Sequence, residues 1–247
     1  METSITDISF KGAMCALADL LMPRVCVACG RILDQCEHNI CPACLEDIPR
    51  TYYWLRTRNP MADSLNAAIG NDGDFRPYSF AAALFFYRKD SKYAGITKSL
   101  KYSHNFKVGR LFGSMLGSCL AGAGHFADVD LVVPVPLHWT RRFRRGYNQA
   151  EVIATAVAAE LGVPVSRGML SRTHRTGTQT HLGREEKASN VRGAFAIGRM
   201  PATAPRHILL IDDVCTTGAT LAQCHKVLSA TLGPSVRISA ATLGCVE

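Results

Sequence analysis

Hydrophobic residues fall into short blocks along most of the chain beyond residue 80. Mainly apolar runs predict strands at four places, residues 81–87, 131–135, 207–211 and 236–243. Apolar residues at helical spacing predict helices between them, at residues 91–102, 106–121, 148–161 and 217–232. Gly162 and Gly233 are the expected ends of the last two helices. Apolar strands that alternate with amphipathic helices are typical of an α/β fold with a mostly parallel sheet and flanking helices.

The first part of the chain lacks this pattern and is rich in cysteine. Five cysteines lie between residues 26 and 44. Residues 56–79 are rich in Gly, Pro, Asn and Asp, which favours a linker or an irregular connection. The sequence therefore predicts a small N-terminal module at 1–55, a linker at 56–79 and a larger domain at 80–247.

The composition is that of a folded protein with a basic surface. Of the 247 residues, 47% are hydrophobic and 19% are charged. The formal net charge of +8 favours anionic partners such as phosphates or nucleic acid, although a merely basic surface would give the same charge. No apolar stretch approaches the ~18 residues that span a bilayer. Glu2 and Asp7 precede the first apolar stretch, where a secretory signal carries positive charges. We therefore expect a cytoplasmic protein without membrane insertion, whose cysteines are thiols or metal ligands.

The strand predicted at 207–211 ends in an unusual combination of side chains. Two acids follow it, and the turn after them is small and rich in hydroxyls: Asp212, Asp213, then Thr216, Thr217, Gly218, Ala219 and Thr220. Because this turn opens a helix, its unpaired backbone N–H groups and the helix dipole would attract a phosphate. The acids would repel a bare phosphate but would accept hydrogen bonds from the 2′ and 3′ hydroxyls of a ribose. A sugar 5-phosphate satisfies both halves of the motif.

Other sites that combine a strand end with acids fit the sequence less well. A Walker B strand needs a G-x-x-x-x-G-K-[ST] loop, which the sequence lacks. A phospho-receiver domain would need more than the 34 residues that follow Asp213. A dinucleotide fold needs G-x-G-x-x-G between a strand and a helix, whereas the nearest match, at 122–127, follows a predicted helix. A simple helix cap would need one such residue rather than five.

The segment after the strand at 131–135 suits the anionic part of such a ligand. Residues 138–149 interleave four arginines with aromatic side chains, and the planar fork of arginine recognises phosphate well. The same mixture suits single-stranded nucleic acid, and a solvated basic loop is the alternative. The residues assigned to the diphosphate and basic loop are Pro136, Leu137, His138, Arg141, Arg145, Asn148 and Gln149, together with Lys98 and Lys101.

A long polar segment, 172–193, separates two apolar elements. Segments of this length inside a compact domain are usually lids or floppy surface loops. Transfer from an activated ribose passes through a cation-like state that water would capture, so a closing lid that carries cations suits this chemistry. The catalytic residues stay unassigned, and the lid candidates are Arg172, Arg175, Gln179, Arg184 and Asn190.

The cysteines of the N-terminal module have the spacing of a structural metal site. Two C-x2-C pairs are separated by eleven residues: Cys26, Cys29, Cys41 and Cys44. Two such knuckles complete a tetrahedral zinc site, and four thiolates leave no open position for chemistry. The spacer is shorter than in the usual ribbon, and Cys36 or His38 could substitute for one ligand. We expect a structural Zn²⁺, with redox dithiols as the alternative.

The motifs together resemble one family. The stretch ILLIDDVCTTGAT at 208–220 resembles the 5-phosphoribosyl 1-diphosphate (PRPP) binding signature of type I phosphoribosyltransferases. With PVPLH, RRGYNQA and RTHRTGTQTHLGREEKASNVRGAF before it, the chain resembles the ComF/GntX family from about residue 21 to 244. Lys98 and Lys101 fall where that family has an L-K-[FY] stretch.

This resemblance implies a type I phosphoribosyltransferase-like fold behind a small zinc-ribbon-like module. It also implies that Asp212 and Asp213 contact the ribose hydroxyls and that residues 216–220 cradle the 5-phosphate. Mg²⁺ would be carried on the diphosphate and ribose oxygens. Some members of the family are tied to DNA uptake during natural transformation.

Three functions compete on this basis. The first is Mg²⁺-dependent transfer of a phosphoribosyl group from PRPP to an unknown acceptor. The second is a competence-type protein that handles single-stranded DNA, with competence proteins as partners, and uses the fold for binding only. The third is a sensor that binds PRPP without turnover.

Overall fold

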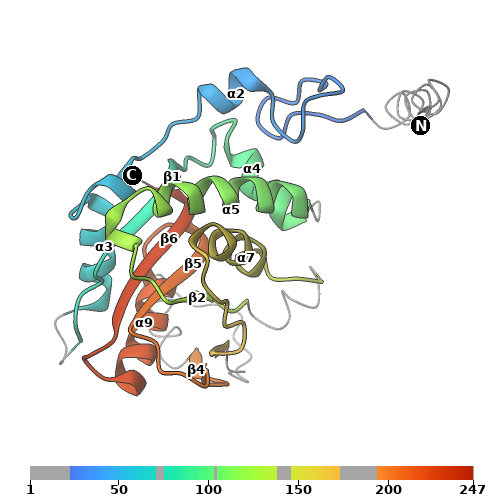
Figure 1. Cartoon of the computed structure of the whole chain (residues 1–247). Helices are drawn as coiled ribbons and strands as arrows, with labels where there is room; N and C mark the ends of the chain where they lie inside the picture. Colours follow the sequence, from blue (N-terminus) through green and yellow to red (C-terminus); the bar gives the residue numbers. More distant parts are fainter. Residues whose placement is uncertain (1–22, 71–74, 103–104, 138–145, 173–193, 247) are drawn as a thin grey trace, which may run out of the picture.

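The computed structural model describes residues 23–70, 75–102, 105–137, 146–172 and 194–246. Four strands form a parallel sheet in the order β1-β6-β5-β2 (Figure 1). Their bounds are β1 Ala81–Phe86, β2 Leu131–Pro134, β5 His207–Cys215 and β6 Arg237–Cys245. A separate antiparallel pair joins β3 (Leu170–Arg172) to β4 (Phe195–Ile197).

Helices cover both faces of the parallel sheet (Figure 1). Alternate strand residues enter two separate hydrophobic clusters; in β5, for example, Leu209 faces one cluster and Leu210 the other. One face packs against α4 (Ala94–Tyr102), α5 (Phe106–Ala121) and α7 (Gln149–Leu161), and the other against α3 (Pro60–Ile69) and α9 (Ala219–Leu232). The remaining elements are α2 (Pro42–Glu46), η1 (Tyr53–Leu55) and η2 (Gly124–Phe126). The predicted mostly parallel sheet with flanking helices is confirmed.

Most predicted boundaries agree with the structure to within a few residues. Helix α5 spans the predicted residues, and Gly162 and Gly233 end α7 and α9 with φ values of 68° and 77°. Strand β5 differs most, because it continues through both acids to Cys215. Its pairing with β6 extends as far as Cys245, so the acids are held by a strand and not by a loop.

The expected linker at 56–79 contains a helix, α3, so an irregular connection is wrong for this part of the segment. Asn59 caps the helix, since its side-chain oxygen accepts a hydrogen bond from the Ala62 N–H at 3.0 Å. Met61, Leu65 and Ile69 recur every four residues and are all buried. The overall composition of the segment is polar, but this short apolar stripe after an Asn-Pro start is sufficient for a packed helix.

The cysteine-rich part of the chain lies beside α4 and contacts it (Figure 1). The Tyr93 hydroxyl donates to the Cys44 carbonyl at 3.2 Å, and Lys92 Nζ lies 2.7 Å from Asp47 Oδ2. The predicted domain boundaries at 55 and 80 remain predictions. In the parts of the chain that the structure describes, every helix is too short or too polar to cross a bilayer.

The amino end of β5 is held by a chain of hydrogen bonds that runs from two buried residues, Ser239 and His207, to the exposed Asp128. His207 Nδ1 lies 2.8 Å from Asp128 Oδ1, and His207 Nε2 lies 2.8 Å from Ser239 Oγ. Burial lowers the pKa of His207, so the ring is neutral and can link both partners. Ser239 is fully buried and accepts a hydrogen bond from the Phe80 N–H. This Ser-His-Asp arrangement therefore joins strands and is closed to substrate.

Candidate functional site

A polar cavity of about 290 Å³ lies at the carboxyl ends of β5 and β2. Ligands of parallel α/β sheets commonly bind at this edge. The cavity contains both acids, part of the turn after them and residues that follow β1 and β2. Its lining consists of Tyr87, Lys101, Val135, Pro136, Leu137, Asn148, Gln149, Ala150, Arg172, Asp212, Asp213, Val214, Thr216 and Thr220.

The two acids of the cavity have different partners. Asp213 Oδ2 lies 2.7 Å from Lys101 Nζ, which comes from the last turn of α4. Asp212 Oδ1 accepts a hydrogen bond from the backbone N–H of Asp213 at 2.8 Å. Burial, followed by repulsion from the Asp213 carboxylate, raises the pKa of Asp212 to about 7. One acid is therefore paired with a cation, while the other retains its proton to unusually high pH.

The raised pKa gives a prediction about stability. In the unfolded chain Asp212 ionises near pH 4, whereas in the folded chain it ionises only near pH 7. Between these values the folded state binds more protons, so the free energy of unfolding falls as the pH rises. Asp212→Asn removes this penalty and is expected to raise the melting temperature at pH 8 by a few degrees, with a smaller gain at pH 5.

Thermal melts of the two proteins across this pH range measure the effect. Asp213→Asn serves as the comparison, because it removes the ion pair with Lys101. An Asp212→Asn protein that is no more stable than the parent at pH 8 would contradict the prediction.

The turn after the acids leads into α9, and Thr216, Thr217 and Ala219 in it are exposed. Gly218 precedes the helix with φ of 70°, a conformation that favours glycine. At the start of the helix, Thr217 Oγ1 accepts a long hydrogen bond of 3.5 Å from the Ala219 N–H. A Cβ atom at Gly218 would approach Leu65 Cδ2 to 2.7 Å, so helix α3 supports the turn from behind. Thr216 and Thr220 line the cavity, whereas Thr217, Gly218 and Ala219 form the backbone between them.

The opposite wall is built from the end of β2 and the start of α7. Asn148 connects the two, because its amide nitrogen donates to the Val135 carbonyl at 2.9 Å and its side-chain oxygen accepts from the Ala150 N–H at 3.1 Å. Pro136, Leu137 and Gln149 complete this wall, and their assignment to a diphosphate remains a prediction. His138, Arg141 and Arg145 lie outside the described residues.

Of the lid candidates, Arg172 lines the cavity at the end of β3. Its guanidinium lies 5.1 Å from the centre of the Phe195 ring on β4. Arg175, Gln179, Arg184 and Asn190 lie outside the described residues. Lys98 lines a neighbouring groove and not this cavity.

Sequence reasoning did not select Tyr87 or Leu65. Tyr87 lines the cavity and is the first residue after β1, so its place at a strand end in a parallel sheet was a usable signal. Leu65 supports the turn from a segment whose composition suggests a linker. Only the helical spacing of Met61, Leu65 and Ile69 points to its buried position.

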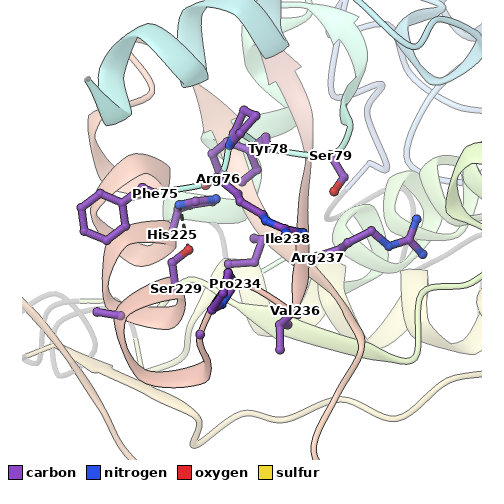
Figure 2. Close-up of a pocket in the computed structure, with 13 residues that line it drawn as sticks. Phe75, Arg76, Tyr78, Ser79, His225, Ser229, Pro234, Val236, Arg237 and Ile238 are labelled. Carbon is purple, nitrogen blue, oxygen red and sulfur yellow. Dashed lines mark hydrogen bonds between the residues drawn. The ribbon is translucent and has the colours of Figure 1, made fainter. Parts of the chain in front are cut away.

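A larger cavity, of about 920 Å³, lies near the amino end of β6. Figure 2 shows His225 and Ser229 from α9 opposite the start of β6 in this cavity, and the His225 ring contacts the Tyr78 ring at 4.5 Å between centroids. His225 is buried, which lowers its pKa to about 4, and its Nδ1 lies 3.3 Å from Ser229 Oγ. None of the residues that line this cavity lines the cavity around the acids. Of the residues predicted to bind PRPP, Asp212, Asp213, Thr216 and Thr220 line the smaller cavity.

The four cysteines of the N-terminal module form one cluster. The Sγ atoms of Cys26, Cys29, Cys41 and Cys44 all lie within 4.8 Å of one another. A tetrahedral site with Zn–S bonds of about 2.3 Å places its sulfurs about 3.8 Å apart. Cys29 Sγ lies 3.9 Å from Cys41 Sγ, so the cluster could hold such an ion.

One further contact and the positions of Cys36 and His38 bear on the ligand set. The Cys41 N–H points to Cys26 Sγ at 3.4 Å, and a hydrogen bond of this kind stabilises a thiolate. Cys36 and His38 are both exposed and do not belong to the cluster. Among the described residues, the two C-x2-C pairs are therefore sufficient for a ligand set.

Comparison with known proteins agrees with the motifs. No protein-family model matches the sequence. Competence protein F of Haemophilus influenzae is 30% identical over 137 residues, which are 54% of this chain and 60% of that protein. The chain is related to competence protein F. This relationship confirms the ComF resemblance that the motifs indicate.

Further similarities include another curated protein and a solved structure. DNA utilization protein YhgH of Salmonella typhi is 34% identical over 99 residues, or 40% of this chain and 43% of that protein. The chain thus spans about half the length of the curated relatives that it matches. Orotate phosphoribosyltransferase from Aeropyrum pernix is 18% identical, with a TM-score of 0.33 over 73% of this chain and 78% of that one.

Proposed function

We propose that the chain binds PRPP with Mg²⁺ and transfers its phosphoribosyl group to an acceptor. One observation carries this proposal: the acid pair at the end of β5 and the exposed turn that opens α9 share one cavity. Carboxylates accept the hydrogen bonds of a ribose diol, and a helix start with bare N–H groups binds a phosphate. The ribose diol of PRPP thus matches the acid pair, and its 5-phosphate matches the adjacent turn that opens α9.

Different residues of the cavity bind different parts of PRPP. Asp212 and Asp213 accept hydrogen bonds from the ribose hydroxyls, and residues 216–220 hold the 5-phosphate. The wall formed by residues 135–137 and Gln149 faces the diphosphate. Lys101 and Arg172 place positive charge at the cavity and oppose the negative charge of the ligand. Mg²⁺, carried on diphosphate and ribose oxygens, would neutralise charge on the departing diphosphate.

We also propose that the cysteine cluster holds a structural Zn²⁺ and that the protein acts in the use or uptake of DNA. The relatives named for competence and for DNA utilization support the second point. The zinc would stabilise the N-terminal module without taking part in chemistry, since four thiolates fill its coordination sphere.

Titration with PRPP tests the central proposal. The parent protein is expected to bind PRPP in the presence of Mg²⁺, as measured by calorimetry. At pH 8, above the pKa of Asp212, Asp212→Asn combined with Asp213→Asn should weaken binding by about 100-fold or more, because two charge-assisted hydrogen bonds of about 1.5–3 kcal/mol each are lost. Release of diphosphate in the presence of candidate acceptors then separates a transferase from a PRPP sensor.

A charge-matched control uses two exposed acids away from the cavity, Asp34→Asn with Asp63→Asn. This variant should bind PRPP as the parent does. Failure of the parent protein to bind PRPP at millimolar concentration would refute the proposal. DNA binding that persists without PRPP binding would favour the alternative, a protein that handles single-stranded DNA and uses the fold for binding only.

A further inference from the structure

A second groove, of about 770 Å³, opens beside the PRPP cavity on the side of β1 and β6. The two share Tyr87, Lys101 and Thr216 as lining residues. The groove extends from these residues along α4 to Lys98 and Tyr102, and past the end of β6 to Val246. It is therefore continuous with the place where the ribose is expected.

The groove is strongly basic. Four cations line it, Arg88, Lys89, Lys98 and Lys101, against one acid, Asp90. Lys101 is paired with Asp213, whereas no carboxylate among the described residues forms an ion pair with the other three cations. Arg88, Lys89 and Lys98 are all exposed. Their charge is thus available to an anion that enters from solvent.

Two tyrosines accompany these cations. Tyr87 lies at the junction with the PRPP cavity, and Tyr102 lies farther along α4 with 73% of its surface exposed. Aromatic faces beside cationic side chains bind nucleotides, because the base stacks on the ring while the cations meet the phosphate. The tyrosines of the groove thus offer contacts for a base, and its cations offer contacts for a phosphate.

The strand order places this groove on the correct side for an acceptor. Strand β5 lies between β2 and β6, so the acids lie between the wall formed by residues 135–137 and the groove. If the diphosphate faces that wall, its departure leaves the opposite face of the anomeric carbon toward the groove. A nucleophile in line with the leaving group must therefore approach from the groove.

We infer that this groove is the acceptor subsite and that the acceptor is a nucleotide, either free or as the end of a single strand. The inference rests on the proposed transferase function. A lone pair of the acceptor forms the new bond to the anomeric carbon as the bond to the diphosphate oxygen breaks. The electron pair of that bond leaves with the diphosphate, and a proton on the acceptor atom passes to water.

Binding of AMP and of a short fluorescent oligothymidylate to the full chain tests the inference. The combined variant Arg88→Ala, Lys89→Ala and Lys98→Ala is expected to weaken nucleotide binding at least tenfold. Lys101 is not substituted in this variant, because it also forms an ion pair with Asp213 in the PRPP cavity. A parallel PRPP titration reports whether the neighbouring cavity is intact. Competition between AMP and the oligonucleotide tells a free nucleotide from a strand end.

A matched control removes three exposed cations from the α5–α7 side of the molecule, Lys107→Ala, Arg110→Ala and Arg167→Ala. This control should bind nucleotides as the parent does. An equal loss in both variants, or no loss in the groove variant, would overturn the inference, as would a parent that binds PRPP but no nucleotide. Absence of PRPP binding is a separate result, and it refutes the transferase proposal itself.

Discussion

Cys41→Ser is expected to release a bound zinc ion and to unfold the N-terminal module. The sulfurs of Cys26, Cys29, Cys41 and Cys44 lie within 4.8 Å of one another, and a tetrahedral ion needs all four. Around them only Leu33, Ile40 and Ile48 supply larger buried side chains from residues 23–50. Zinc binding in small modules stabilises the folded form by on the order of 10 kcal/mol, so this core is insufficient without the metal.

Metal analysis and limited proteolysis measure this effect. The parent protein should contain one zinc per chain and resist cleavage between residues 23 and 48, whereas Cys41→Ser should lose both properties. Cys36→Ser is the matched control, because Cys36 is exposed and lies outside the cluster. Loss of zinc in the Cys36→Ser protein, or full protease resistance of a metal-free parent, would contradict the assignment.

The cysteine spacing and the acid-and-hydroxyl motif could be interpreted from sequence because their chemistry is local. Each depends on residues within a few positions, such as two thiols on one knuckle. The ion pair between Lys101 and Asp213 depends instead on which helix lies beside β5. Side-chain chemistry alone does not encode that arrangement, so the pairing becomes visible only in the fold.

Helix α3 shows a second limit of sequence interpretation. Its segment has the composition of a linker, and its apolar stripe is only three residues long. The helix gains its stability from packing against β1 and against α9, and α9 lies far away in the sequence. The same packing places Leu65 behind Gly218, so a feature of the candidate site depends on contacts with high sequence separation.

Gly113→Val is expected to destabilise the fold by about 3 kcal/mol or more, because α5 and α7 are in close contact at this point. A Cβ atom at Gly113 would lie 2.9 Å from Ala156 Cβ and 3.0 Å from the Ile153 carbonyl oxygen. Gly109 and Gly117, one turn away on either side, face α7 at similar distances. The backbone of α7 cannot move away without disturbing its buried contacts with β2 and β5.

The stabilities of Gly113→Ala and Gly113→Val distinguish the effect of close packing from the effect of helix propensity. Alanine has a higher helix propensity than glycine by about 1 kcal/mol, so propensity alone would make Gly113→Ala more stable than the parent. Close packing predicts the reverse order: parent, then Gly113→Ala, then Gly113→Val, as measured by chemical denaturation. Gly124→Val is the control, since a Cβ there has no neighbour within 4 Å and should leave stability nearly unchanged. Because α7 begins at the cavity wall formed by Asn148 and Gln149, Gly113→Val should also weaken PRPP binding. A Gly113→Val protein as stable as the parent would show that the two helices are not in close contact.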